Sequence, residues 1–170
     1  MRFSPAVAAG LALTALIVAA PAMARDFVLE KYFAGKSRAV GSFSAINGAN
    51  NSFDVDLTGK WNGKVLTLRE DFIYADGKRD TKTWRFTKLT ENTYSGTRED
   101  VVGETLVTVK GDTAKFTYLV YLSPEEKKNL VRFHDTMVLK DDGTVLNNAW
   151  VTKFGFPVAK TKVEFTRSKK

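Results

Sequence analysis

Apolar and polar residues alternate along most of the chain after residue 25. Within residues 52–60, Phe53, Val55 and Leu57 fall on one side and mainly polar residues on the other. Because successive strand residues point to opposite faces, this spacing predicts a strand with one apolar face. Similar segments rich in Val, Thr and aromatic residues predict about ten strands. Their expected ranges are 36–46, 52–60, 64–75, 79–89, 93–99, 104–110, 113–122, 131–140, 144–154 and 159–167.

Two-residue turn signals separate these segments. Gly beside Asn or Asp favours a tight hairpin, because these residues tolerate positive φ. The signals are Asn47-Gly48, Asn62-Gly63, Asp76-Gly77, Gly111-Asp112 and Asp142-Gly143, with Glu91-Asn92 as a weaker sixth.

Two segments have helical patterns instead. Residues 27–33 have a short amphipathic spacing. In residues 123–130, Ser123 is a candidate N-cap, Pro124 takes the first helical position, and Glu126 completes a capping box. A short helix is therefore expected in each.

Successive hairpins without long crossovers favour a closed architecture. An antiparallel up-and-down β-barrel of about 8–10 strands removes exposed sheet edges, and a sandwich is the alternative. A barrel of this size can hold one small ligand inside. The sequence therefore predicts an all-β, up-and-down barrel domain over residues 25–170.

The N-terminal residues have the order of a secretory signal peptide. A positive start precedes the apolar run 6–20, and Ala22-Met23-Ala24 forms a small-x-small cleavage site. We expect cleavage of residues 1–24 before Arg25 and a soluble periplasmic or secreted protein. The alternative is an uncleaved membrane anchor.

The amino-acid composition limits the kinds of chemistry and partner that this protein can have. The chain has no cysteine, which excludes disulfides, a thiol nucleophile and a lipid-anchored N-terminal cysteine. The net charge is +7, and removal of residues 1–24 takes away one Arg, which leaves +6. The basic residues are dispersed among acidic ones, which is typical of a solvated surface. Peripheral contact with an anionic membrane surface is the alternative role of this charge, and nucleic acid is not an expected partner. The sequence leaves open whether the protein has a protein partner.

Strand alternation also sorts the candidate interior residues. Glu70 shares a face with Phe72 and Tyr74, whereas Asp71 falls on the other face. These adjacent carboxylates cannot flank one glycosidic bond, and Glu70 is the one expected inside. The candidate ligand-binding residues are Glu70, Phe72, Tyr74, Trp84, Arg85, Phe116, Tyr118, Asp135, Trp150 and Lys153.

Interior carboxylates need partners, because an unpaired buried charge costs several kcal/mol. The basic residues expected to pair with Glu70 and Asp135 are Arg85, Lys153 and Arg167. Two interpretations stay open. The charges are structural ion pairs near the barrel rims, or they fix the polar head of an otherwise apolar ligand.

Catalytic motifs are missing. His134 is the only histidine, and no cysteine is present to complete a usual zinc ligand set. No Gly-x-Ser-x-Gly or Gly-rich phosphate loop occurs. We expect no metal, no cofactor and no catalytic residue, with His134 on the surface. Acid–base chemistry by Glu70 and Asp135 across the barrel remains the enzymatic alternative.

The start of the domain resembles lipocalin-type barrels. In "FVLEKYFAGKSRAVGSF", a short helix leads to Gly35 at the first strand, and Arg167 in "VEFTR" lies where that superfamily often closes the barrel with a basic residue. The superfamily's Gly-x-Trp is missing at Gly35, which Lys36 and Ser37 follow. A Gly-Lys-Trp occurs at 59–61, in an expected hairpin.

Nearly the whole mature chain resembles a proteobacterial family of exported proteins of unknown function, grouped with the calycin barrels. The matching stretches are "YFAGKSRAVGSF", "GKWNGKVLTLREDFIYADG", "YSGTREDVVG" and "NNAWVTKFGFPV". Many members resemble lipoproteins, whereas this chain lacks the required cysteine. The resemblance implies an association with modified fatty-acid metabolism and implies no catalytic residues.

The expected function is binding of a lipid, fatty acid or similar apolar molecule in the cell envelope. Two alternatives remain. One is an envelope structural or accessory protein whose barrel is filled by side chains. The other is a small barrel isomerase or hydrolase that acts on a lipid-like substrate.

Overall fold

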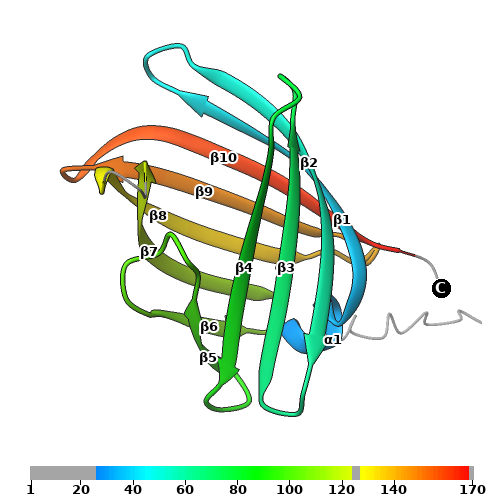
Figure 1. The fold of residues 1–170 in the computed structure, drawn as a ribbon. Coiled ribbons are helices and arrows are strands. Elements are labelled where there is room, and N and C mark those ends of the chain that lie inside the picture. The colour runs from blue at the N-terminus through cyan, green and yellow to red at the C-terminus, as the bar shows by residue number, and fades with distance from the viewer. Residues whose placement is uncertain (1–25, 124–126, 169–170) are drawn as a thin grey trace, which may run out of the picture.

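In residues 26–123 and 127–168, which the computed structural model describes, ten antiparallel strands form a closed barrel with one short helix at one end (Figure 1). Consecutive strands are neighbours, and β1 pairs with β10 to close the barrel. The expected signal peptide lies outside the described residues. The bounds are α1 Leu29–Phe33, β1 Gly35–Ala45, β2 Asn50–Trp61, β3 Val65–Tyr74, β4 Arg79–Lys88, β5 Thr93–Thr97, β6 Thr105–Lys110, β7 Thr113–Ser123, β8 Lys128–Leu139, β9 Val145–Lys153 and β10 Phe156–Arg167.

The strand and turn predictions are confirmed. Each predicted strand corresponds to one observed strand, with ends that differ by a few residues. The expected turn signals lie between neighbouring antiparallel strands. Gly63 and Gly143 have φ of 94° and 84°, values that residues with a side chain rarely adopt.

The prediction of a second helix over residues 123–130 is wrong. Ser123 ends β7, Lys128 begins β8, and the two residues pair with each other. Residues 124–126, which carry most of the capping signal, lie outside the described residues. The cross-strand ladder continues through the pair Tyr121 and Leu130, and a helix of this length has little stability of its own to compete with it.

Helix α1 covers one end of the barrel, which we call the helix end (Figure 1). A strongly apolar group from this segment is buried in the core and consists of Phe27, Leu29, Tyr32 and Phe33. The Tyr32 hydroxyl donates a hydrogen bond of 2.9 Å to the Phe165 carbonyl on β10. The predicted helix at 27–33 is therefore confirmed as a five-residue helix, held by packing rather than by its own length.

A charged group completes the helix end. Lys88 Nζ lies 2.5 Å from Glu30 Oε1, and the hydroxyl of fully buried Tyr94 donates to Glu30 Oε2 at 2.6 Å. Burial alone would raise the pKa of Glu30, but the hydrogen bonds from Lys88 and Tyr94 hold it below its ordinary value. These contacts tie α1 to β4 and β5.

Between β4 and β7, backbone hydrogen bonds do not connect the strands of the barrel wall along their whole length. Strands β5 and β6 are short, and β5 pairs only with residues 85–88 of β4. Residues 98–104, which connect β5 to β6, lie beside the rest of β7, where Val102 donates to the Leu119 carbonyl and Val101 bridges Val120. On the β4 side, side chains make the contact.

Gly59 of β2 allows α1 to approach the barrel, and its substitution tests this packing. A Cβ at Gly59 would lie 1.8 Å from the Phe33 carbonyl oxygen, which belongs to the backbone and cannot rotate away. We expect Gly59→Ala to lower the free energy of unfolding by about 1–3 kcal/mol, the usual cost of overpacking. Chemical denaturation measures it, with Gly96→Ala, which faces only side-chain atoms near 3.0 Å, as the milder comparison. Equal stability of Gly59→Ala and wild type would contradict the packing described here.

Candidate functional site

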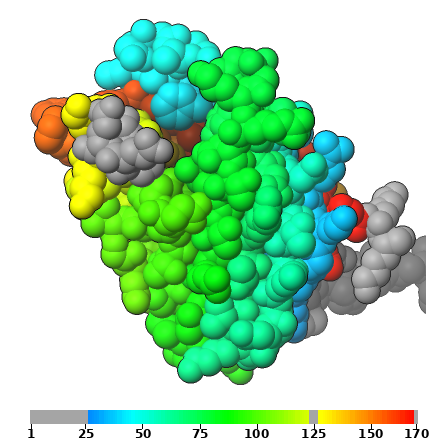
Figure 2. All heavy atoms as spheres, in the orientation of Figure 1, coloured from blue at the N-terminus to red at the C-terminus, as the bar shows by residue number. Residues whose placement is uncertain are grey.

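A cavity of about 700 Å³ occupies the barrel interior. It extends from Leu29 and Phe33 of α1 to Asn51 and Leu122, near the opposite end. The tips of the β1–β2, β3–β4 and β9–β10 hairpins project there, as Figure 2 shows in cyan, green and orange, and we call it the hairpin end. The volume falls in the range of small-molecule sites, about 300–1,000 Å³.

Aromatic side chains form much of the cavity wall. Tyr118 of β7 stacks on Phe133 of β8, with ring centroids 5.4 Å apart. Its ring also meets Trp84 of β4 edge-on, at 5.2 Å, and Trp84 stacks on Phe86. These side chains occupy inward positions on β4, β7 and β8. The alternation along each strand that predicted the strands therefore also produces an apolar wall. The further aromatic lining residues are Phe43, Phe53, Phe72, Tyr74, Phe116, Tyr121 and Phe165.

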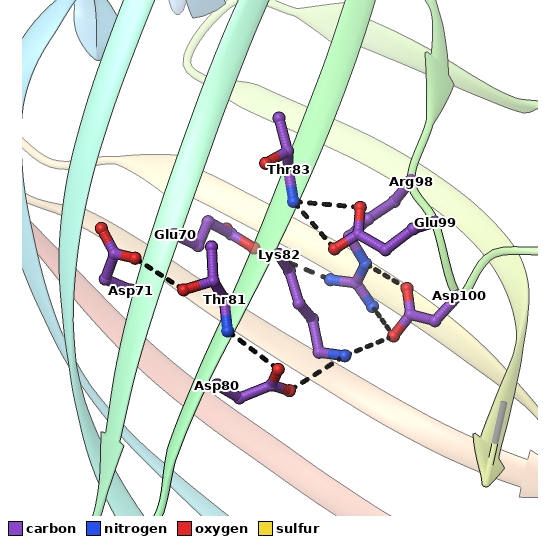
Figure 3. Close-up of polar contacts among 9 residues, drawn as sticks. All are labelled: Glu70, Asp71, Asp80, Thr81, Lys82, Thr83, Arg98, Glu99 and Asp100. Atoms are coloured by element: carbon purple, nitrogen blue, oxygen red, sulfur yellow. Dashed lines mark hydrogen bonds and ion pairs between the residues drawn. The ribbon is translucent and has the colours of Figure 1, made fainter. Parts of the chain in front are cut away.

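A charged cluster interrupts this wall where the strands are not paired (Figure 3). Arg98 donates to both Asp100 oxygens, from Nε at 2.6 Å and from Nη2 at 3.2 Å. Lys82 Nζ lies 2.8 Å from Asp100 Oδ2 and 3.2 Å from Asp80 Oδ2. The Thr83 amide donates to the Glu99 carboxylate. Side chains thus connect β4 to residues 98–100 in the absence of a backbone ladder.

Arg98 is also packed against aromatic rings. Its guanidinium carbon lies 4.7 Å from the Trp84 ring centroid and 5.6 Å from that of Tyr118. Its side chain is only 11 % exposed, so the cation is desolvated and its contacts with the rings and with Asp100 strengthen. Arg98 and Lys82 in turn hold the pKa of buried Asp100 below its ordinary value, although burial acts to raise it.

Glu70 faces this cluster from β3 without a hydrogen bond to its Oε2. Arg98 Nη1 is 3.8 Å from that oxygen, an ion-pair distance but too long for a hydrogen bond. Burial raises the pKa of Glu70 to about 7, and the attraction of Arg98 only partly opposes it. Asp71 lies on the outer face, where Arg69 and Thr81 donate to it.

Asp135 of β8 is the second interior carboxylate. The Asn147 amide nitrogen on β9 donates to Asp135 Oδ1 at 2.5 Å. Asp135 Oδ2 and Asn147 Oδ1 are buried and have no hydrogen-bond partner in the part of the chain that the structure describes. Burial raises the pKa of Asp135 to about 6, against the effect of the Asn147 hydrogen bond and the Arg98 charge. Carboxyl groups with such pKa values can be neutral or charged near physiological pH.

The structure gathers most of the predicted site residues around one cavity. The predicted residues that line it are Glu70, Phe72, Tyr74, Trp84, Phe116, Tyr118 and Asp135. Three predicted residues do not belong to this lining: Arg85, Trp150 and Lys153.

For Arg85 and Trp150, the reason is that successive strand residues point alternately inward and outward. Arg85 lies between inward Trp84 and Phe86 and is exposed on the outer face. Trp150 is 61 % exposed, because its neighbours Ala149 and Val151 take the inward positions of β9. Aromatic character had favoured Trp150, but alternation decides its direction.

The expected basic partners of the two carboxylates are also wrong. Lys153 Nζ lies 3.2 Å from Asn129 Oδ1 at the hairpin end, and Arg167 is exposed. Arg98 is the cation beside Glu70, whereas an amide, Asn147, bonds Asp135.

Sequence reasoning missed Arg98, Lys82, Asp100 and Asn147. Arg98 follows Tyr94 and Gly96 at a spacing of two, Lys82 precedes Trp84 by two, and Asn147 stands between inward Val145 and Ala149. The alternation therefore contains the signal for these three residues. Asp100 lies beyond the end of β5, where alternation gives no information.

Histidine and metal chemistry find no support in the described residues. His134 is exposed, as predicted, with Nε2 3.2 Å from Thr152 Oγ1. No group of three or more His, Cys, Asp or Glu residues within residues 26–123 and 127–168 has the arrangement of a metal site. In the same part of the chain, no helix is long and apolar enough to cross a membrane.

The fold and its internal cavity define a lipocalin-like barrel. The S-type phycobiliprotein lyase CPES of Guillardia theta has a similar structure, with a TM-score of 0.59 and 10% identity over 85% of this chain and 94% of that chain. Rv2717c of M. tuberculosis is similar at a TM-score of 0.56 and 13% identity, over 81% and 93% of the two chains. At such identities the likeness shows the fold alone.

Residues 14–167 match the family described as "Protein of unknown function (DUF3833)", and the chain belongs to this family. No curated protein matches the sequence. The lipocalin-like fold and the membership in a family of unknown function are thus confirmed. The proteobacterial and exported character of the family stays a prediction.

The buried carboxyl groups generate a prediction about stability and pH. Their pKa values, about 7 for Glu70 and about 6 for Asp135, exceed their ordinary values of 4.5 and 3.8. The folded protein therefore binds more protons than the unfolded chain in this window, and its stability falls as pH rises from about 5 to about 8. Glu70→Gln should remove the Glu70 part of this loss, about 3 kcal/mol.

Denaturant titrations of wild type and Glu70→Gln at both pH values measure this difference. Asp71→Asn, on the outer face next to Glu70, is the matched control and should keep the wild-type slope. If Glu70→Gln lowers stability at alkaline pH, Glu70 is a structural ion-pair partner of Arg98 instead.

Proposed function

We propose that this protein binds a lipid, fatty acid or similar apolar small molecule inside its barrel. The observation that carries the proposal is the cavity of about 700 Å³, whose wall is largely aromatic and aliphatic and carries its charged side chains mainly in one cluster. Sites of this kind use apolar surface for affinity and a small number of polar groups for orientation. A side-chain-filled barrel, the structural alternative, fits this cavity less well.

The proposal includes a location in the cell envelope. The run 6–20 and the triplet Ala22-Met23-Ala24 support export and cleavage before Arg25. An exported carrier would shield an apolar molecule from water between membranes. The phycobiliprotein lyase shares the fold, and its activity is not transferred to this chain.

A second observation favours peripheral contact with an anionic membrane through the hairpin end. Large apolar side chains there are strongly exposed, with Ile46 at 79 %, Phe154 at 90 % and Phe156 at 73 %. Lys153 Nζ lies 5.8 Å from the Phe154 ring centroid, and exposed Lys160 pairs with the position of Trp150 on the outer wall. Aromatic side chains beside lysines suit the interface of an anionic bilayer.

Cavity binding is tested with Nile red, a neutral dye whose fluorescence rises in apolar surroundings. We expect saturable binding and displacement by long-chain amphiphiles. Val163→Trp places a ring in the cavity and should weaken dye binding about tenfold or more. Val40→Trp, on neighbouring strand β1 but 64 % exposed, is the matched control and should bind like wild type. Absence of saturable binding to the folded wild type would contradict the proposed function.

Membrane contact is tested by co-sedimentation with vesicles. The protein should bind phosphatidylglycerol-containing vesicles and bind phosphatidylcholine vesicles weakly, with binding reduced by salt. Phe154→Ser combined with Phe156→Ser should abolish binding, because apolar insertion is lost. Leu89→Ser removes an apolar side chain that is 56 % exposed in the turn at the helix end and should leave binding unchanged. Equal loss in both variants would refute a specific role of the hairpin end.

A further inference from the structure

The polar atoms that the cavity leaves without partners are all acceptors. Glu70 Oε2, Asp135 Oδ2 and Asn147 Oδ1 are buried on cavity-lining side chains, and no group of residues 26–123 or 127–168 forms a hydrogen bond with them. Their residues are exposed by only 9 %, 5 % and 8 %. Buried polar atoms are almost always satisfied, so these oxygens indicate a missing donor from water or from a ligand.

Most of the protein's own donors nearby are already engaged, and the Tyr118 hydroxyl, which lies close enough to Asp135 to lower its pKa, is the main remaining donor. Arg98 directs two donors at Asp100 and packs its guanidinium against Trp84. Lys82 is held between Asp80 and Asp100 (Figure 3). The Asn147 amide nitrogen bonds Asp135. None of these contacts can be redirected to the vacant oxygens without leaving another buried charge or acceptor unpaired.

The balance of charge around the cavity is acidic. Glu70 and Asp135 lie close enough to a common neighbour, Tyr118, for both to raise the pKa of its hydroxyl, after burial as the main cause. The cavity is lined by two basic side chains, Lys82 and Arg98, and by five acidic ones, Glu70, Asp80, Glu99, Asp100 and Asp135. An anionic ligand in this space would be repelled, whereas a cationic ligand or a neutral hydrogen-bond donor would be attracted.

We propose that the cavity selects an amphipathic molecule whose head group donates hydrogen bonds, a hydroxyl or a protonated amine, to Glu70, Asp135 and Asn147. The apolar chain then lies along the aromatic wall. This inference rests on the proposed function and specifies its ligand class. A head group that only accepts hydrogen bonds leaves the three oxygens unpaired and binds more weakly.

Fatty acids are a special case of this selection. A carboxylate head adds a negative charge, so an acid binds well only when the ligand, Glu70 or Asp135 takes up a proton. Its affinity therefore rises as pH falls. The other titratable or charged groups that face Glu70 across the cavity are Lys82 of β4, Arg98, Glu99 and Asp100 after β5, and Tyr118 of β7.

The experiment compares ligands that differ only at the head group. Dodecanol, dodecylamine, dodecanoate and methyl dodecanoate each displace Nile red from the wild-type protein at about pH 8, where free carboxyl groups are ionised. We expect dodecanol and dodecylamine to bind with an affinity at least about tenfold higher than that of dodecanoate and the ester. Dodecanoate should gain affinity at about pH 5, whereas the ester should not.

Variants assign the selection to the named residues. Asp135→Asn and Glu70→Gln should each weaken dodecylamine binding and reduce the discrimination against dodecanoate. Asp71→Asn, an adjacent carboxylate on the outer face, should retain the wild-type order. Circular dichroism checks folding, and the comparison among ligands needs only the wild-type protein if a variant fails to fold.

The outcomes separate this inference from the proposed function. If dodecanoate binds as tightly as dodecylamine at about pH 8, the donor selection is wrong, while binding of an apolar molecule stands. If Nile red binds and all four head groups compete equally, the oxygens contribute nothing to recognition and the inference fails. If neither dye nor amphiphile binds, both the inference and the proposed function fail.

Discussion

The contact between Arg98 and Asp100 is the interaction on which the interior depends. It lies where β4 extends beyond its backbone pairing with β5, so side chains replace the missing backbone ladder. The guanidinium packs on Trp84 and stands 3.8 Å from Glu70. One desolvated cation thus joins the wall, orders the aromatic rings and partly neutralises a buried carboxylate. Removing one partner of such a contact leaves an uncompensated charge in an apolar interior.

The helix end and the middle of the barrel have opposite character as a result of local sequence. At the helix end, Phe33 packs against Gly59, and Glu30 bonds Tyr94. Its charged group is paired and its aromatic residues fill space. Toward the middle, Glu70 and Asp135 face the cavity with unpaired oxygens. Paired charges at the helix end and acceptors without a protein donor in the cavity are consistent with the proposed role of the protein as a ligand carrier.

Strand periodicity and turn residues make most of the fold predictable, because both act locally. The same period correctly predicts that Glu70 points inward and Asp71 outward. The prediction fails for Trp150, which is predicted inside because it is aromatic although its strand position points outward. It also fails at 123–130, where a capping pattern competes with strand pairing. Parity with Gly96 also indicates the inward direction of Arg98. The wall gap and the contact to Asp100 depend on how far short strands reach, which no local pattern contains.

A crystal structure with dodecylamine bound tests the central claim most directly. The claim predicts the alkyl chain against Trp84 and Tyr118, with the amine within about 3 Å of an oxygen of Glu70, Asp135 or Asn147. An amine directed to solvent at the hairpin end, with only the chain inside, would contradict donor selection. A dodecylamine molecule found only outside the barrel, with the cavity filled by water, would contradict the account of this protein as a carrier.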